Sequence, residues 1–322
     1  MKAIRFDATG GPEVLRLVDI AEPAPGAGQI RIRAGAIGIN FIDTYHRTGL
    51  YPVPLPSGLG LEAAGVVDAI GDGVTRFAVG DRAGFCSGPI GAYAQAHLVP
   101  EDRAVKLPAA LSDDNAAACL LKGMTARYLL RKTFRVEPGH TVLIHAAAGG
   151  VGQILVQWAK RLGATVIAVA GNAQKAQLAS DLGADHVIPD TDDIAAIVRT
   201  RTNGQGVDVV YDSVGKTTFQ ASLKSLKPLG LFVSYGNASG PPPAVEPGIL
   251  AANGSLFFTR PTLATYTRTA ELLQETADEL FAILATGGVK LAAPTRYALA
   301  DAAQAHADLE GRKTTGSLVL IP

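Results

Sequence analysis

The sequence predicts an α/β protein of two domains: a β-barrel-like domain of antiparallel strands, and a doubly wound parallel-sheet domain inserted into it. In residues 1–124, short runs that alternate apolar with polar residues are separated by Gly- and Pro-rich turns. In residues 125–264, strand-like runs alternate with helical segments, which is the pattern of a parallel sheet covered on both faces. Residues 265–322 hold a long helix and a short final strand, so we assign them to the first domain.

The composition narrows the classes of partner. The 322 residues are 48% hydrophobic and 18% charged, and the formal net charge is zero. No basic run is long enough to favour nucleic acid or an anionic membrane, and no apolar run approaches the roughly 18 residues of a membrane span. Cys86 and Cys119 lie far apart, which favours a reducing compartment. We therefore expect a soluble, cytoplasmic protein that binds a small molecule.

The first domain is expected to begin with short strands and to end in a helix. The period-2 runs place strands at residues 2–6, 15–20, 29–40, 63–71, 81–86 and 92–100. In residues 111–133 the apolar period lengthens to that of a helix. Ser112 and the acidic residues after it form an N-terminal cap signal for this helix.

The inserted domain is expected to alternate strands with helices of ordinary length. Strands are predicted at residues 141–146, 165–170, 186–190, 207–214, 231–236 and 255–260, with helices between them that include 153–163 and 173–183. Such an order gives βαβ units and therefore a parallel sheet.

One glycine-rich turn carries the strongest functional signal. The predicted strand 141–146 runs into residues 147–152 (AAGGVG) and then directly into a helix. This is G-x-G-x-x-G with alanine at the first position, in the strand-to-helix context in which the motif binds dinucleotides. The glycines let backbone N–H groups approach a pyrophosphate, and the helix N-terminus favours its negative charge. The alternative is a turn whose glycines serve packing alone. We predict dinucleotide binding.

The end of the second strand indicates which dinucleotide binds. Enzymes that use NAD carry an Asp or Glu there, which accepts a hydrogen bond from the ribose 2′-hydroxyl. This strand ends at Gly171 without an acidic residue, and the next charged residue is Lys175. A cation suits the 2′-phosphate of NADPH, although a solvated lysine at a helix start is the alternative. We therefore predict NADPH rather than NADH.

Several separated stretches resemble one known family. They are residues 36–52, 55–67, 121–130, 145–167 and 209–215. Together they resemble the zeta-crystallin-like NADPH:quinone oxidoreductases, a zinc-independent branch of the medium-chain dehydrogenase/reductase superfamily, over nearly the whole chain. The resemblance implies a discontinuous GroES-like catalytic domain, an inserted Rossmann domain and a homodimer. Residues 254–262 (GSLFFTRPT), an apolar strand late in the sheet, could pair with a second copy.

The resemblance also bears on metal binding. Alcohol dehydrogenases of the superfamily carry a Gly-His-Glu motif that supplies a zinc ligand, but the matching residues here are Gly60, Leu61 and Glu62. Asn40 stands where those relatives have a cysteine ligand. Leucine cannot bind a metal, so we expect none. Hydride transfer without a Lewis acid suits quinones or conjugated carbonyls better than alcohols.

Two other functions stay open. A closely related one is NADPH-dependent reduction of the carbon–carbon double bond of an enone or enoyl thioester, which the sequence does not separate from quinone reduction. The other, from a different class, is a cofactor-binding protein that binds RNA or accumulates as a structural protein. The neutral charge and the lack of a basic patch argue against RNA.

The resemblance implies roles for residues at the nicotinamide end of the cofactor. It places Asn40 and Tyr45 near the nicotinamide ribose and the substrate, with Tyr51 at the edge of that pocket. Thr125 matches the residue that contacts the carboxamide, and Asn237 fits the nicotinamide side. Tyr45, and less readily Tyr51, could donate a proton to the developing enolate or quinol oxygen, or simply pack against the cofactor.

Other residues are expected at the pyrophosphate and the adenosine. Gly150 and Val151 would lie against the pyrophosphate, and Ser213 at the adenine-side edge. Arg312 matches a family arginine that reaches over to the cofactor, although a surface cation is the alternative.

The adenosine ribose is where the chain departs from its relatives. The resemblance places Gly171 and Lys175 against the ribose and its phosphate. Relatives often have a tyrosine after the third strand, near the 2′-phosphate, whereas this chain has Asp190 in residues 188–191 (IPDT). If Asp190 points inward, its charge weakens the preference for NADPH.

Overall fold

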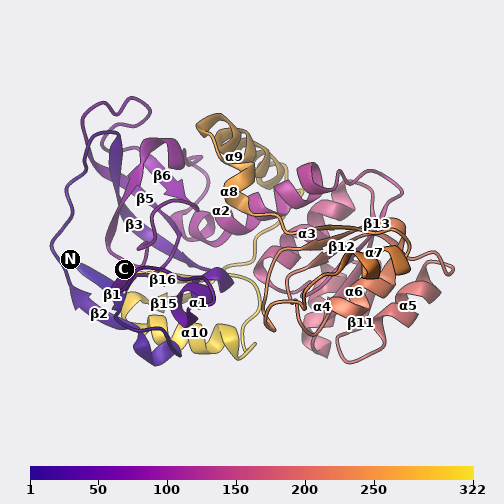
Figure 1. Cartoon of the computed structure of the whole chain (residues 1–322). Helices are drawn as coiled ribbons and strands as arrows, with labels where there is room; N and C mark the ends of the chain where they lie inside the picture. Colours follow the sequence, from indigo (N-terminus) through magenta and orange to yellow (C-terminus); the bar gives the residue numbers. More distant parts are fainter. The chain divides into compact units, whose positions relative to one another are not determined.

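The computed structural model describes all 322 residues, and they form two compact units (Figure 1). The first unit comprises residues Met1–Met124, Thr267–Phe281 and Leu291–Pro322, and the second comprises Thr125–Tyr266 and Ala282–Lys290. The last of these segments differs from the expected division, which assigned it to the first domain. Its contacts explain this, because the side chain of Gln157 in the second unit donates to Lys290 O (3.2 Å) and accepts from Lys290 N–H (2.8 Å).

The first unit consists mainly of antiparallel strands. They are β1 (Lys2–Phe6), β2 (Arg16–Asp19), β3 (Gln29–Ile39), β4 (Ser57–Gly58), β5 (Glu62–Ile70), β6 (Arg82–Phe85), β7 (Ala96–Pro100), β8 (Val105–Lys106), β15 (Thr295–Ala298) and β16 (Leu318–Ile321). The larger sheet has the order β15-β16-β3-β5-β6-β8, with β7 also paired to β3, and the smaller has the order β2-β1-β4. Only β15 and β16 pair in parallel. The C-terminal strand β16 pairs with β3, so distant parts of the chain complete one sheet.

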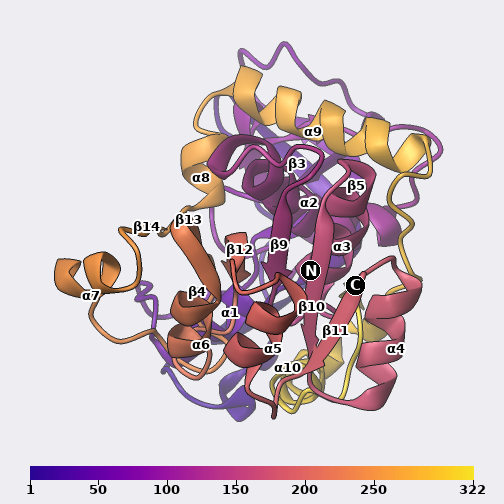
Figure 2. The same ribbon diagram turned by 90° about the vertical axis from the view of Figure 1, so that its right-hand side faces the viewer.

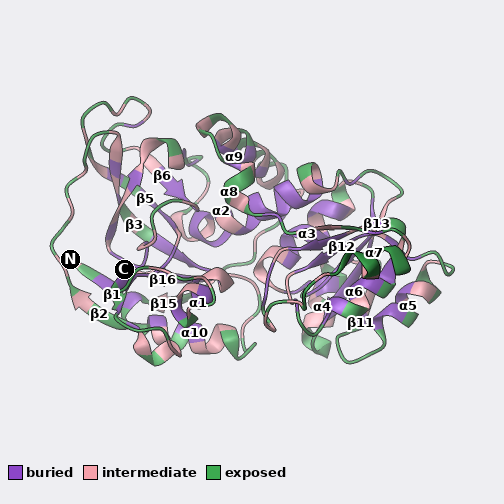
Figure 3. Ribbon diagram, viewed as in Figure 1, coloured by how far each residue is buried: buried purple, intermediate pink, exposed green.

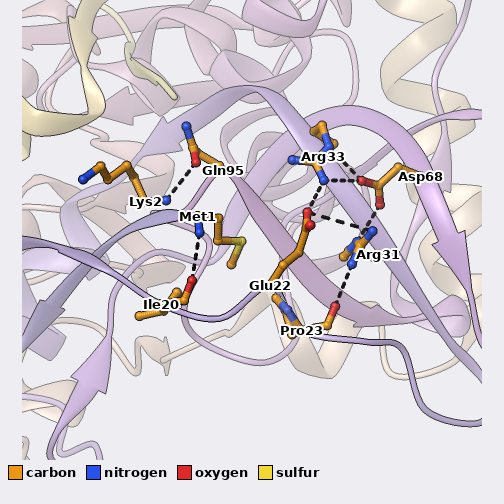
Figure 4. A network of polar contacts seen from close by, with 9 residues as sticks. All are labelled: Met1, Lys2, Ile20, Glu22, Pro23, Arg31, Arg33, Asp68 and Gln95. Carbon is orange, nitrogen blue, oxygen red and sulfur yellow. Dashed lines mark hydrogen bonds and ion pairs between the residues drawn. The ribbon is translucent and has the colours of Figure 1, made fainter.

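In its first half, strand β3 has one face in the core and one face toward solvent. Ile30 is completely buried, whereas Arg31 and Arg33 point to the other face. Both guanidinium groups bind Asp68 of β5 at 2.7 Å, and Arg33 also contacts Glu22 (Figure 4). Partial burial raises the pKa of Asp68, but the hydrogen bonds from Arg31 and Arg33 outweigh this and lower it below its usual value. These ion pairs join β3 to β5.

Four helices lie wholly or mostly in this unit. They are α1 (Phe41–Thr48), α2 (Asp113–Tyr128), α9 (Ala270–Ala285) and α10 (Ala302–Glu310). The last residues of two of them, α2 and α9, belong to the second unit. The sequence analysis predicted helices at α2 and α9, but it did not predict α1, α10 or β15. Helix α10 is short and rich in alanine, so its sequence shows little contrast between an apolar and a polar face. None of the chain's helices combines the length and hydropathy that crossing a membrane requires.

The second unit contains a six-stranded parallel sheet. Its strands are β9 (Thr141–Ile144), β10 (Thr165–Ala170), β11 (His186–Pro189), β12 (Val207–Asp212), β13 (Leu226–Ser234) and β14 (Phe257–Thr259). The order is β11-β10-β9-β12-β13-β14, and every pair is parallel. From β9 the chain adds strands β10 and β11 on one side, and from β12 it adds β13 and β14 on the other, so the strand order reverses between β9 and β12. In open sheets of this kind ligands bind at the carboxyl ends of the strands, at such a reversal.

Helices cover both faces of this sheet. The helices that contact its strands are α3 (Gly150–Arg161), α4 (Ala173–Asp181), α5 (Ile194–Arg201) and α6 (Phe219–Ser225). The unit also contains α7 (Pro247–Ala252) and α8 (Leu263–Tyr266). Helices α5 and α6 pack against each other on one face, and α3 lies on the opposite face (Figure 2). The strands between them are mostly buried (Figure 3). The predicted fold class is confirmed.

Helix α3 packs on the sheet with its apolar side. Leu155, Trp158 and Ala159 are buried, whereas Lys160 and Arg161 lie in the last turn, where the helix dipole favours cations. Trp158 is the single tryptophan of the chain and is 4% exposed. The burial of this face fixes the start of α3, and with it the glycine-rich turn.

Candidate active site

The turn between β9 and α3 is fixed by backbone hydrogen bonds. After β9 the chain turns at Ala146, which has a left-handed φ of 50°, and α3 begins at Gly150. Ala147 N–H donates to Val169 O of the neighbouring strand β10 at 3.1 Å, and Gly149 N–H donates to Ala146 O at 2.9 Å. The path of the turn is therefore set before the helix begins.

A side chain does not fit at Gly152. A Cβ there would lie 2.3 Å from Ala146 O and 2.8 Å from Ala147 Cα, and both of these are backbone atoms. This close contact of helix and strand end is the role of the last glycine in a dinucleotide fingerprint. The N–H groups of Gly150 and Val151 lie in the first helical turn, where they have no partner within the helix and can bind a phosphate. The residues present therefore fit a pyrophosphate.

A buried polar network joins the ends of β9 and β12. His145 follows β9, Asp212 ends β12, and Ser222 belongs to α6; all three are 0% exposed. Ser222 Oγ–H donates to Asp212 Oδ2 at 2.7 Å, so its oxygen accepts from His145 Nε2–H at 3.0 Å. Burial lowers the pKa of His145, which favours the neutral ring. The network therefore links His145, which precedes the glycine turn, to Asp212, which precedes Ser213.

Ser213 and Asn237 lie on adjacent loops at the same edge of the sheet. Ser213 follows β12, and Asn237 lies in the loop after β13 and is 8% exposed. Ala238 N–H donates to Ser213 O at 3.1 Å, and a Cβ on Gly236 would lie only 2.4 Å from the same oxygen. The structure thus brings these two predicted residues together.

Gly171 and Lys175 lie at the end of β10 and in the first turn of α4. Asn172 Oδ1 accepts a hydrogen bond from Lys175 N–H at 2.8 Å, which caps the helix. The carboxylate of Asp190 lies next to Gly171, because its Oδ2 is 3.1 Å from the position that a Cβ would take. Asp190 therefore does point toward the place predicted for the adenosine ribose.

In the first unit, Asn40 is held by a buried ion pair. Asn40 precedes α1, and its Nδ2–H donates to Glu62 Oε2 at 2.7 Å. Lys122 Nζ lies 3.6 Å from the same oxygen and donates to Ile39 O at 3.2 Å. Burial raises the pKa of Glu62, although the ammonium of Lys122 opposes this. Gly38 leaves room for the carboxylate, since a Cβ there would lie 2.2 Å from Glu62 Oε2.

A second buried chain of hydrogen bonds ends on α1. Asp43 Oδ2 accepts from Tyr93 Oη–H at 2.9 Å, and Tyr93 Oη lies 3.1 Å from His306 Nε2. Arg47 Nη1 donates to His306 Nδ1 at 3.0 Å, so the neutral ring donates from Nε2 to Tyr93. Burial raises the pKa of Asp43 to about 7 and lowers that of His306 to about 3, the latter helped by the charge of Arg47. Arg47, His306 and Tyr93 thus each donate to an acceptor in this chain, whereas Asp43 Oδ1 is buried without a hydrogen-bond partner.

The remaining predicted residues are Tyr45, Tyr51, Thr125 and Arg312. Tyr45 is 7% exposed on α1, the helix that follows Asn40, and its ring meets that of Tyr51 edge-on at 5.2 Å. Thr125 is 7% exposed on α2. Arg312 lies in an exposed loop after α10, with a left-handed φ of 56°.

The sequence analysis missed the buried residues that support α1 and Asn40. They are Asp43, Glu62, Tyr93, Lys122 and His306. A signal exists for Glu62, because β5 (EAAGVVDAI) begins with a carboxylate and continues with small and apolar residues. A charge in such a buried stretch requires a partner, but the sequence does not say which residue supplies it.

The side chains do not fit a zinc site. No group of three or more His, Cys, Asp or Glu residues could hold a metal ion. The amide of Asn40 is bound to Glu62, and Cys86 and Cys119 are buried thiols whose pKa is raised by burial. The donor set thus lacks the thiolates and imidazoles that zinc requires.

Two family models match the chain. One, described as "Zinc-binding dehydrogenase", matches residues 150–285, and the other, "Alcohol dehydrogenase GroES-like domain", matches residues 26–109. With the antiparallel first unit and the glycine turn of the second, they define a medium-chain dehydrogenase/reductase.

Individual relatives narrow this class. The chain is 50% identical to the quinone oxidoreductase of Pseudomonas aeruginosa over 100% of its length and 99% of that protein. It is 46% identical to the 2-haloacrylate reductase of a Burkholderia species over 97% of the chain and 96% of the relative. The crystal structure of Escherichia coli quinone oxidoreductase complexed with NADPH superposes with a TM-score of 0.98 at 48% identity and covers 100% of both chains. The chain belongs to the quinone oxidoreductase family.

Proposed function

We propose that the chain is an NADPH-dependent oxidoreductase that reduces quinones or conjugated carbonyl compounds. The observation that carries this is the turn at residues 146–152, where a Cβ on Gly152 would meet backbone and where the N–H groups of Gly150 and Val151 begin a helix. The position of this turn, at the reversal of strand order, supports a dinucleotide as the ligand.

The second unit supplies the residues for most of the cofactor. Gly150 and Val151 would bind the pyrophosphate through backbone N–H groups, while Ser213 and Asn237 would line the same sheet edge. Thr125 is proposed for the carboxamide. When bound, NADPH supplies the hydride; the protein supplies its orientation, which is a large part of catalysis in such reactions.

The ribose end of the cofactor would lie against Gly171 and Lys175. The position of Lys175 in the first turn of α4 supports a role for its ammonium at the 2′-phosphate. We also propose that Arg312 approaches the cofactor, as its family counterpart does.

In the first unit, Asn40, Tyr45 and Tyr51 are the proposed residues near the nicotinamide and substrate. Glu62 accepts from Asn40 Nδ2–H, and the Asn40 side chain also takes part in the capping box of α1 with Asp43, so the amide is held in one orientation. Tyr45 carries the phenol that can donate a proton to a reduced oxygen, and the ring of Tyr51 packs against it. With no residues suited to zinc, hydride transfer suits an electron-poor acceptor better than an alcohol.

The test follows NADPH oxidation by absorbance with a panel of quinones, enones and 2-haloacrylates. We expect turnover with at least one class, and NADPH binding that is lost in Gly152→Ala. Tyr45→Phe separates the two roles of the phenol, because a proton donor lowers kcat by a factor of about 10² to 10⁴, whereas a packing residue mainly changes KM. Wild-type protein that neither binds nor oxidises NADPH would contradict the proposal.

A second candidate activity is reduction of an activated carbon–carbon double bond. The similarity to a 2-haloacrylate reductase over almost the whole chain favours it. The same panel distinguishes the two, since kcat/KM for quinones and for haloacrylates or enones is compared on one protein.

We further propose a homodimer formed along β14 and a cytoplasmic location. Strand β14 is the last strand of the sheet, and Phe257 on it is 60% exposed, which supports pairing with a second copy. Two buried free cysteines are in keeping with a reducing compartment. Light scattering after size exclusion should give the mass of a dimer for the wild type and of a monomer for Phe257→Asp.

A further inference from the structure

Strands β10 and β11 end side by side, and this places Asp190 beside Gly171. In the parallel register Ala170 pairs with Pro189, so the next residues, Gly171 and Asp190, leave the sheet together. Asp190 N–H also donates to Ala170 O at 3.1 Å. The position of the Asp190 backbone is therefore fixed by the sheet and not by the loop that follows.

The side chain of Asp190 occupies the space that Gly171 leaves open. Its Oδ2, Cγ and Oδ1 atoms lie 3.1, 3.6 and 3.8 Å from the position of a Gly171 Cβ. A residue larger than glycine would have to push this carboxylate aside. The carboxylate thus lies at the end of β10, although it comes from the end of β11.

The end of the second strand is where dinucleotide folds meet the adenosine ribose. A carboxylate there accepts a hydrogen bond from the 2′-hydroxyl of NADH, whereas it repels the 2′-phosphate of NADPH. Lys175, in the first turn of the helix that follows Gly171, carries the opposite charge. The same corner of the second unit therefore offers one group suited to each cofactor.

We propose that Asp190 determines cofactor specificity. Its carboxylate accepts a hydrogen bond from the 2′-hydroxyl of NADH, and its charge limits the preference for NADPH that Lys175 provides. This inference rests on the proposed NADPH-dependent function. It assigns to a residue of the third strand the task that an acidic residue of the second strand performs in NAD enzymes.

The test measures dissociation constants of NADPH and NADH by protein fluorescence. For Asp190→Asn the ratio of the NADH to the NADPH dissociation constant should rise about tenfold. NADPH should bind more tightly because its 2′-phosphate no longer faces a carboxylate, and NADH should bind more weakly because its 2′-hydroxyl has a poorer acceptor. Lys175→Met should change the ratio in the opposite direction. Asp192→Asn removes the same charge two residues further along, and should change the ratio less than twofold.

A half-cofactor probe localises the effect. Binding of adenosine 2′,5′-bisphosphate should tighten in Asp190→Asn, whereas binding of adenosine 5′-monophosphate should not. A ratio that is unchanged in Asp190→Asn, or one that changes as much in Asp192→Asn, would overturn the inference. Wild-type protein that binds neither cofactor would instead defeat the proposed function, so the two failures are distinct.

Discussion

The glycine turn of the second unit and the polar networks under α1 in the first unit are built in opposite ways. The turn at residues 146–152 depends on side chains that are absent, since backbone atoms lie where a Cβ on Gly152 would be. Asn40 and Asp43 depend on side chains that are present and buried, the charged Glu62 for Asn40 and the neutral Tyr93 for Asp43, and these come from segments far apart in the chain. The difference teaches that the turn is sensitive to added atoms, whereas the first unit is sensitive to lost charge.

The largest expected effect comes from breaking the ion pair beside Asn40. Lys122→Met keeps much of the side-chain volume but leaves the carboxylate of Glu62 buried without its cation. We expect the free energy of unfolding to fall by about 3–5 kcal/mol. Denaturant unfolding of the purified protein measures it.

The double variant Glu62→Gln/Lys122→Met is the matched control for this loss. Removing both charges should restore most of the free energy, because no uncompensated charge stays buried. A double variant as unstable as Lys122→Met alone would show that packing, and not charge, dominates there.

The next effect tests the turn by adding a single methyl group. In Gly152→Ala the new Cβ meets Ala146 O and the backbone of Ala147, so strand and helix must separate. We expect a loss of about 1–3 kcal/mol in the free energy of unfolding, with NADPH binding lost. Gly248→Ala is the control, because nothing lies within 4 Å of its Cβ, and it should lower neither quantity.

The pH dependence of the unfolding free energy tests the buried carboxyl group of Asp43. Its folded pKa of about 7 lies above the unfolded value of roughly 3.9, so the folded state keeps a proton that the unfolded state loses. Its contribution to stability is complete below pH 4 and is lost as the pH rises to about 7. The unfolding free energy of Asp43→Asn, minus that of the wild type, should thus rise by up to about 1.4 kcal/mol per pH unit and level off above pH 7.

The contribution of His306 has the opposite sign. Its folded pKa of about 3 lies below the usual value of 6.5, so its contribution is present above pH 6.5 and is lost as the pH falls. Because both proteins retain His306, this term cancels in the difference. A difference that does not depend on pH between 4 and 7 would contradict the protonated state of Asp43.

The smallest effect is expected where charges meet near the surface. Asp68→Asn weakens the contacts to Arg31 and Arg33, but these groups are partly exposed and screened by salt. We expect a loss of less than about 1 kcal/mol, which decreases further in high salt, as measured by thermal unfolding. A loss as large as that of Lys122→Met would show that burial is not what separates the two ion pairs.

The same difference explains what could be predicted from the sequence. Gly149, Gly150 and Gly152 are consecutive or nearly so, and a strand and a helix flank them, so a local pattern predicts their geometry. Most strands and the parallel sheet follow from apolar periods in the same way. Sequence alone could not say that Asp190 points toward Gly171, because this depends on the register of two strands.

The charged networks are beyond such local patterns. Arg47 meets His306, a residue 259 positions away, and Tyr93 meets the same histidine from 213 positions away. Each of these residues has an ordinary surface interpretation when it is considered singly. Their partners become visible only when the final helix α10, which the sequence did not predict, packs in the first unit.

Trp158 gives the molecule an internal optical probe. It is the one indole of the chain, it is nearly buried, and it belongs to the helix that begins with the glycine turn. Its emission overlaps the absorption of a reduced nicotinamide, so occupancy of the dinucleotide site should quench it without any label. Unfolding of that helix should shift the emission to longer wavelengths, so one signal can follow both ligation and melting in the second unit.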